Sequence, residues 1–306
     1  MKKYIKHIII GFVIVLGLDL SVGRLLNHYY FKTTSGLFQR TTFSMEESKA
    51  DILVFGTSRA NHHYDIKLIE EKTGISAYNT GRDGNFVFYQ TAILKSVLER
   101  YTPKKIILDF TGTFAYRQED YDRLSSLLPY YKTHPEIRDI IELKSSFERF
   151  KLMSSIYPYN SLLTTIIAGN LDFNKTRKNN QGAFKGYLPL AGVYTQPLDS
   201  LEVLPYYEKI DNNKIAVFTE FLNLSKENNI DLTVVYSPVY YLYENNYDVS
   251  LCREICKENG VRFIDYSKDE EFLDHSNLFR DKTHLNSDGA SLLTNKVLEE
   301  MKKTKG

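Results

Sequence analysis

Three side chains near opposite ends of the sequence have the types and spacing needed for nucleophilic catalysis. Ser58 follows Gly56 and Thr57 directly after an apolar run, and Asp281 precedes His284 by three residues. A serine hydroxyl becomes an effective nucleophile only when a neighbouring base removes its proton. An aspartate so placed can fold back to hold the imidazole Nδ1–H, which leaves Nε2 facing the serine. The sequence therefore predicts a nucleophile, a base and an orienting acid.

An alternation of apolar runs and amphipathic segments must position these residues. The expected strands cover 52–55, 75–78, 105–110, 231–236 and 261–264, and the expected helices cover 66–72, 86–101, 211–228, 247–258 and 287–302. Strands that alternate with helices predict a parallel sheet covered on both faces, here a three-layer α/β/α sandwich of flavodoxin-like type. In such sheets the site lies at the carboxyl ends of the strands, which is where Ser58 follows the first strand.

The composition is that of a folded protein with little net charge. Of the 306 residues, 42% are hydrophobic and 25% are charged, and the formal net charge is +1. These values argue against disorder and against the strongly basic field of nucleic-acid-binding proteins, so no nucleic acid is expected as a partner. Cys252 and Cys256 lie one helical turn apart, where buried thiols are favoured over a disulfide. Aromatic residues are abundant, with 23 Tyr and 18 Phe, but Trp is absent.

The N-terminus has the pattern of a membrane segment. Lys2, Lys3 and Lys6 flank the apolar or glycine residues 8–18, and apolar residues resume after Asp19. Basic residues favour the cytoplasmic side of a membrane helix. We therefore expect a single-pass protein of the cytoplasmic membrane, with the remaining chain outside the cytoplasm.

Two interpretations fit residues 1–26. They can be a signal peptide that is cleaved near 21–23, or an uncleaved anchor that crosses the membrane with residues 5–26. Because 21–23 make a poor cleavage site and apolar residues continue beyond it, we favour the anchor.

The rest of the chain is expected to divide into a connector and one large domain. Residues 27–50 are polar with scattered aromatics, which is typical of a connector, and the α/β domain occupies 51–306. The alternation of strands and helices breaks off at about 115–205. A stretch this long inside an alternating fold predicts a helical cap insertion.

Three blocks of the sequence resemble those of the SGNH (GDSL-like) hydrolase family. They are Gly56-Thr57-Ser58, Asn79–Gly84, and the Asp281–His284 segment, and the resemblance covers about 50–114 and 209–302. It implies that the backbone NH groups of Ser58 and Gly84 bind the oxyanion of a tetrahedral intermediate. The anchor and the cap lie outside the resemblance.

The third block departs from that family. It usually reads Gly-x-Asn-Asp, and its Asn side chain donates to the oxyanion. Thr113 occupies the position of that Asn here, and its hydroxyl is expected to donate to the oxyanion, although it reaches less far. Loss of one oxyanion donor typically lowers the rate by about 10²–10³-fold.

Polar residues after the serine suggest contacts with substrate. Arg59, Asn61 and His62 are candidate substrate-binding residues, and Arg59 has an equally weighted alternative role as the partner of a buried acid. The nearby His and Asp residues lack a spacing such as His-Glu-x-x-His, so no metal ion is expected. Residues 79–84 lack the first glycine of the dinucleotide fingerprint, so no cofactor is expected either.

The resemblance implies a serine esterase or O-acyltransferase. Its expected substrates are acyl esters, such as acetyl esters, of an extracytoplasmic polysaccharide or cell-wall glycan. A transferase would need an acyl donor, for which a multispanning acyltransferase is a candidate partner. Two alternatives remain open: a lipid esterase or thioesterase, and a non-catalytic glycan-binding or assembly component that keeps the fold.

Overall fold

The computed structural model describes residues 2–34, 36–171, 184–202, 209–243 and 246–303, without the side chains of 199–202. The chain divides into two compact units. Unit 1 comprises residues 1–43 and 118–177, and unit 2 comprises 44–117 and 178–306. The boundaries of unit 1 thus differ from those expected for the cap, since the N-terminal helix belongs to the same unit and 178–205 does not.

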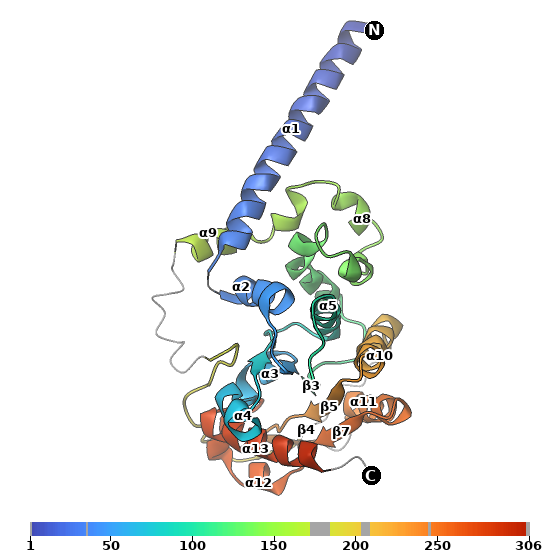
Figure 1. Ribbon diagram of the computed structural model, residues 1–306. Coiled ribbons are helices and arrows are strands. Elements are labelled where there is room, and N and C mark those ends of the chain that lie inside the picture. Colours follow the sequence, from blue (N-terminus) through green and yellow to red (C-terminus); the bar gives the residue numbers. More distant parts are fainter. Residues whose placement is uncertain (1, 35, 172–183, 203–208, 244–245, 304–306) are drawn as a thin grey trace. The chain divides into compact units, whose positions relative to one another are not determined.

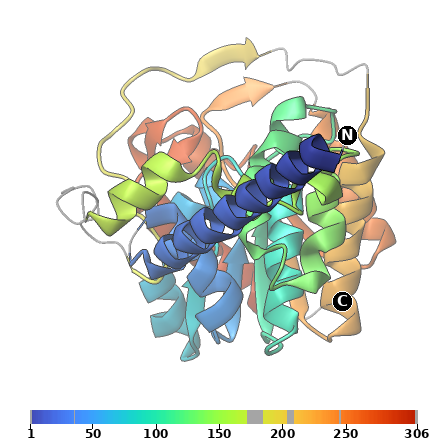
Figure 2. The ribbon, with the colours of Figure 1, turned by 90° about the horizontal axis from the view of Figure 1, so that it is seen from above.

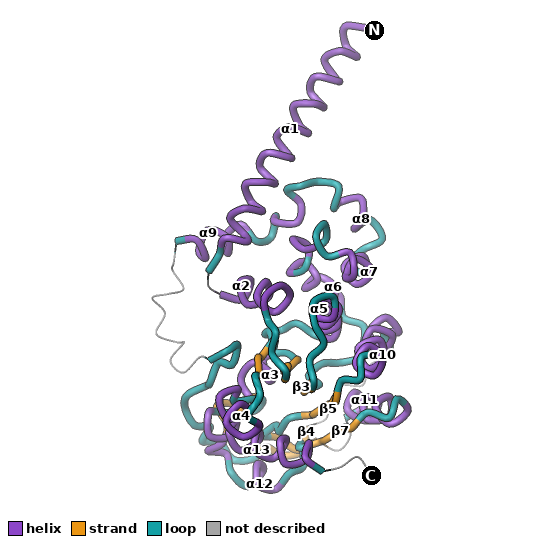
Figure 3. Tube along the Cα trace, viewed as in Figure 1, coloured by secondary structure: helices purple, strands orange, loops and turns teal. Residues whose placement is uncertain are grey.

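Unit 2 contains a five-stranded parallel sheet. Its strands, in the spatial order β2-β1-β3-β5-β7, are Ala77–Asn79, Ile52–Phe55, Lys105–Asp109, Asp231–Tyr236 and Arg262–Asp265. All four residues of β1 are fully buried, as expected for a central strand covered on both faces. Figures 1 and 3 show these strands surrounded by helices. The predicted α/β fold is therefore confirmed.

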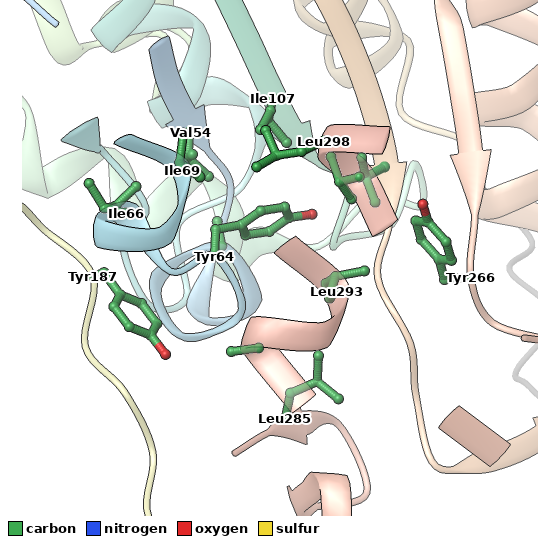
Figure 4. Close-up of a cluster of buried hydrophobic side chains, with 14 of the residues drawn as sticks. Val54, Tyr64, Ile66, Ile69, Ile107, Tyr187, Tyr266, Leu285, Leu293 and Leu298 are labelled. Atoms are coloured by element: carbon green, nitrogen blue, oxygen red, sulfur yellow. The ribbon is translucent and has the colours of Figure 1, made fainter. Parts of the chain in front are cut away.

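Helices cover the two faces of this sheet. On one face lie α3 (Ser58–His63), α4 (Ile66–Thr73) and α13 (Ser287–Lys302), whose apolar side chains pack against alternate strand residues such as Val54 and Ile107 (Figure 4). On the other face α5 (Val87–Leu98) and α10 (Asn212–Glu227) lie side by side (Figure 2), and the ring of Phe55 contacts that of Phe221 at 5.3 Å. Successive strand side chains thus point into two separate cores.

The remaining elements of unit 2 lie at its edges. Helix α11 (Tyr247–Glu258) packs on β7, and it carries Cys252 and Cys256 as buried free thiols, as predicted. Helix α12 covers Glu270–Leu273, and a 3₁₀ turn covers Ser276–Leu278. Two small sheets, which the sequence did not predict, pair β4 (Asp199–Glu202) with β6 (Tyr241–Tyr243) and β8 (Phe279–Asp281) with β9 (His284–Leu285).

Unit 1 is helical. It contains α1 (Lys2–Lys32), α2 (Gly36–Thr42), α6 (Gln118–Asp122), α7 (Arg138–Glu142), α8 (Glu148–Lys151) and α9 (Leu163–Asn170). Single 3₁₀ turns cover Arg123–Ser126, Leu128–Tyr130, Pro135–Ile137 and Tyr157–Tyr159, and a π-helix over Phe43–Glu47 leads into unit 2. Most of the expected connector is therefore helical. The reason is long-range packing: Tyr130 is hydrogen-bonded to both Tyr30 and Thr42.

Within the described residues, α1 is the one helix long and apolar enough to cross a membrane. Its polar residue Asp19 accepts hydrogen bonds from the Ser154 hydroxyl (2.5 Å) and from the backbone NH groups of Ser155 (2.7 Å) and Ile156 (3.3 Å). One turn later Gly23 lies so close to Ser155 that a Cβ atom there would clash. These contacts hold α1 against the other helices of unit 1.

The same face of α1 continues to contact unit 1 beyond that point. Asn27 donates to the hydroxyl of Tyr159 at 2.7 Å, and Tyr30 is 2% exposed. The helix therefore runs without a break through 21–23.

Candidate active site

The predicted nucleophile lies at the carboxyl edge of the sheet. Strand β1 ends at Phe55, and Ser58 begins α3 two residues after Gly56. Gly56 has φ +145°, and a Cβ atom there would lie 2.6 Å from the Cβ of Ala60 and 2.8 Å from the carbonyl oxygen of Asp109. Glycine alone fits this turn, because it has no Cβ and tolerates a positive φ. The turn leaves Ser58 half-buried.

The β8–β9 hairpin brings the predicted acid and base together. His284 Nδ1 lies 3.0 Å from both carboxylate oxygens of Asp281, so it donates to this carboxylate. His284 Nε2 lies 2.9 Å from Ser58 Oγ and can accept its proton. These distances are those of a nucleophile, a base and an orienting group in hydrogen-bond contact. Ser58 and His284 are 226 positions apart in the sequence.

Several donors keep Asp281 ionised. Its Oδ1 accepts from the backbone NH and the hydroxyl of Thr283 and from the backbone NH of His284. Partial burial acts to raise the pKa of Asp281, but the Thr283 NH and the His284 side chain outweigh it, so the pKa is lowered. The carboxylate is thus available to hold the Nδ1–H of His284 at neutral pH.

A pocket of about 330 Å³ opens beside Ser58 and His284. Its lining is rich in aromatic side chains, which include Phe86, Tyr236, Tyr241 and Tyr247. Tyr247 is 52% exposed and lies at the start of α11, whereas Tyr236 ends β5 and is buried. The pocket therefore offers apolar ring surfaces next to the hydroxyl of Ser58.

The structure gives Thr113 a different partner from the one predicted. Its hydroxyl donates to Asp248 Oδ1 at 3.1 Å, and the same oxygen accepts from the NH of Phe114 at 2.7 Å. Burial raises the pKa of Asp248, although these two donors act to lower it. Buried Lys214 binds the same loop, donating to the carbonyl oxygens of Thr113 (3.0 Å) and Ala115 (2.6 Å). The Thr113 hydroxyl thus lines the pocket with its proton directed to Asp248.

Gly84 and Asn61 are not among the described residues that line the pocket. Gly84 follows β2 in a turn with φ +68°. Asn61 is fully buried, because its side chain donates to Asp83 Oδ1 at 2.8 Å and its carbonyl oxygen accepts from the NH of Leu188. A contact between Asn61 and substrate remains a prediction.

His62 is also bound by the chain itself. Its Nδ1 donates to the carbonyl oxygen of Leu188 at 2.6 Å, and its Nε2 lies 3.8 Å from Asp83 Oδ1. His62 is outside the described pocket lining, although its ring contacts that of His284 edge-on at 5.9 Å. The structure thus favours a supporting position behind His284 over a substrate contact.

Arg59 takes the second of its two predicted roles while lining the pocket. Its guanidinium is buried, 4.0 Å from Asp109 Oδ1, and its Nε donates to the Thr111 hydroxyl at 2.9 Å. The guanidinium also lies over the ring of Tyr236 at 4.5 Å. Arg59 is therefore the partner of a buried acid.

Comparison with known proteins gives a weak structural likeness. No protein-family model and no curated protein matches the chain. One similar solved structure is described as a candidate acylhydrolase from Bacteroides fragilis, with TM-score 0.43 and 10% identity over 88% of this chain and 96% of that one. Another, described as a candidate platelet activating factor from Streptococcus pneumoniae, has TM-score 0.43 and 10% identity over 92% and 99%.

His63 and Asp248 were not predicted as parts of the site. The backbone NH of Leu285 donates to His63 Nε2 at 3.0 Å, so Nδ1 carries the proton and faces Ser237 Oγ at 3.1 Å. Burial, together with the charge of Arg59, lowers the pKa of His63 well below its ordinary value. Neutral His63 thus ties β9 to the sheet behind His284. Asp248 could have been found from its position in the sequence, because it follows Asn246, the N-cap of a helix that comes after the carboxyl end of β5.

Proposed function

We propose that the chain is a serine esterase or O-acyltransferase in which Ser58, His284 and Asp281 form the catalytic triad. The observation that carries this proposal is the unbroken chain of contacts from Ser58 Oγ to His284 Nε2 and from His284 Nδ1 to Asp281. This is the arrangement needed to remove a serine proton and to stabilise the imidazolium that forms.

The reaction follows from these contacts. Ser58 Oγ attacks the acyl carbon as its proton passes to His284 Nε2, and the tetrahedral intermediate collapses when His284 protonates the leaving alcohol. Water in an esterase, or a sugar hydroxyl in a transferase, then gives its proton to His284 and attacks the acyl-enzyme. The second tetrahedral intermediate collapses as the bond from the acyl carbon to Ser58 Oγ breaks and His284 returns the proton to Ser58. For the oxyanion we propose the NH of Ser58, which lies in the first turn of α3 where NH groups have no intrahelical partner, and the NH of Gly84.

For the substrate we propose an acylated glycan outside the cytoplasm. The pocket volume suits a small acyl group, and the rings of Tyr241 and Tyr247 offer surfaces on which a sugar can stack. With α1 as a single-pass anchor, the basic residues Lys2, Lys3 and Lys6 favour a cytoplasmic N-terminus. Unit 2 would then meet polysaccharide or cell-wall glycan.

A fluorophosphonate probe tests the nucleophile directly. We expect the detergent-solubilised full chain to be labelled on Ser58, as mapped by peptide mass spectrometry, and to hydrolyse p-nitrophenyl acetate. The Ser58→Ala variant should lose the label, whereas Ser291→Ala, which changes a half-buried serine of α13, should keep it. A wild-type chain that is neither labelled nor active would contradict the proposal.

The orienting acid can be tested by an isosteric change. In Asp281→Asn the amide can donate to Nδ1 of His284, which places the ring proton on Nε2. A protonated Nε2 cannot accept the proton of Ser58. We expect kcat for p-nitrophenyl acetate to fall by up to about 10⁴-fold. Asp274→Asn, an exposed change a few residues away, should leave kcat unchanged. Equal kcat values for the two variants would count against the triad.

One observation favours a second candidate, a non-catalytic glycan-binding or assembly component. The hydroxyl of Thr113, at the position of the family's Asn, donates to Asp248. This removes a side-chain donor that was expected at the oxyanion. Binding of an acylated glycan that survives Ser58→Ala, with no turnover of any acylated glycan by the wild-type chain, would support this candidate.

A further inference from the structure

An exposed apolar stripe lies in unit 1 beside α8. Phe147, Phe150 and Met153 are 67%, 68% and 77% exposed, although each is a large apolar side chain. They recur at every third position, and the backbone NH groups of Phe150 and Met153 donate to the carbonyl oxygens of Phe147 and Phe150, so the three residues lie on successive turns of the chain. Clustered exposed apolar side chains mark a surface that contacts another apolar phase or molecule.

The stripe adjoins α1 at one defined level. Met153 directly precedes Ser154, and segment 154–156 holds the carboxylate of Asp19 through three hydrogen bonds. Asp19 immediately follows the apolar residues 8–18 of α1. Because a carboxylate is costly in hydrocarbon, Asp19 marks the outer part of the anchor 5–26, near the boundary between hydrocarbon and lipid headgroups. Contact with Asp19 therefore places the stripe next to that boundary.

The charges near the stripe are arranged as a membrane surface requires. Segment 144–157 contains three basic residues and one acidic residue. The acidic one, Glu148, is fully buried and accepts from the hydroxyls of Tyr157 (2.6 Å) and Ser145 (2.7 Å). Arg149 and Lys151 are exposed. Apart from Ser146, the exposed side chains of this segment are thus apolar or cationic.

A basic groove adjoins the same place. It has a volume of about 280 Å³ and lies between α1 and residues 128–159, with Leu20 and Arg24 on one side and Lys132 on the other. Lys132 Nζ donates to Ser155 Oγ at 3.3 Å, within the segment that binds Asp19. Two cations one to two helical turns beyond the apolar part of α1 lie at the level expected for lipid phosphates.

We propose that residues 147–156 of unit 1 form a second membrane contact, on the leaflet from which α1 emerges. Phe147, Phe150 and Met153 insert among the acyl chains, and the cations of Arg24, Lys132 and Arg149 face anionic headgroups. The occupant of the stripe is the bilayer, because the stripe is continuous with the membrane helix and is flanked by cations. This contact does not depend on the catalytic proposal.

The absence of Trp makes the contact measurable, because each Trp variant contains a single tryptophan and its tryptophan emission comes from one position. We would reconstitute full-length Phe150→Trp, Met153→Trp and Tyr247→Trp in vesicles of phosphatidylcholine and phosphatidylglycerol, with or without brominated acyl chains. Bromolipid is expected to quench the emission of Phe150→Trp and Met153→Trp severalfold, and the emission of both variants should be blue-shifted. Tyr247→Trp is the control, since Tyr247 is an exposed aromatic residue of unit 2, and it should stay unquenched.

Two results would overturn the proposal. If the Phe150→Trp and Met153→Trp variants are quenched no more than the control, the stripe does not reach the acyl chains. If their emission is blue-shifted but unaffected by bromolipid, the stripe is covered by protein, such as a second copy of the chain. A further expected result is weaker quenching when phosphatidylglycerol is omitted, and equal quenching would refute the role of the cations.

Discussion

Replacing Ser58 by Ala is expected to lower kcat for p-nitrophenyl acetate by about 10⁴–10⁶-fold, because the proposed attacking oxygen is removed. Adding His284→Ala to this variant should lower kcat no further. His284 contributes by taking the proton of Ser58 across the 2.9 Å contact, so it has nothing to activate once the hydroxyl is gone. Rates of the two single variants and the double variant, measured in one detergent, test this non-additivity.

The control for this series is His275→Ala. His275 is an exposed histidine of the same region, and its Nδ1 faces the carbonyl oxygen of Glu271. Its removal should leave kcat unchanged. If the losses of Ser58→Ala and His284→Ala multiplied in the double variant, the two side chains would act independently, which the triad does not allow.

Replacing Asp109 by Ala is expected to cost about 3–5 kcal/mol of the free energy of unfolding, because it leaves the buried cation of Arg59 without its acid. Asp109 is fully buried and accepts from the hydroxyls of Tyr64 (2.7 Å) and Thr111 (2.5 Å). Burial and the charge of Asp109 raise the pKa of Tyr64 well above its ordinary value, so Tyr64 remains a donor. Three groups therefore lose a partner together.

Asp231→Ala provides the matched control. Asp231 begins the neighbouring strand β5 and forms a partly exposed ion pair with Lys105, which is worth at most about 1 kcal/mol. Denaturant unfolding of the full chain in detergent, followed by the near-ultraviolet circular dichroism of its tyrosines, compares the two variants. A cost for Asp109→Ala as small as that for Asp231→Ala would show that the buried network is not needed for stability. Combining Asp109→Leu with Arg59→Met should cost less than the sum of the single changes.

The sequence was sufficient to predict the elements whose signal is local. Strands 52–55 and 231–236 and helices 247–258 and 287–302 begin and end in the structure where apolar periodicity and flanking residues placed them. Strand β2 begins two residues later than expected, at Ala77. The parallel order of the sheet follows from the alternation of strands and helices.

Contacts between distant segments account for what the sequence did not reveal. The expected connector is helical because its aromatic and hydroxyl side chains pack on Tyr130, about a hundred positions away. The side chain of Asn61 donates to Asp83, that of His62 to the carbonyl oxygen of Leu188, and that of Thr113 to Asp248. No periodicity encodes such pairings. Ser58 and His284 are equally distant, but their chemistry suggested a common site, and the structure brings them within hydrogen-bond distance.

The contacts along α1 also fix how the helix is rotated about its own axis. Asp19, Gly23 and Asn27 recur every four residues and all face the other helices of unit 1. A helix held at three successive turns along one face cannot swivel about its own axis without breaking the hydrogen bonds to Asp19 and Asn27. A membrane partner that recognises the opposite face of α1, such as a multispanning acyl donor, would thus meet unit 1 in a single orientation about the helix axis.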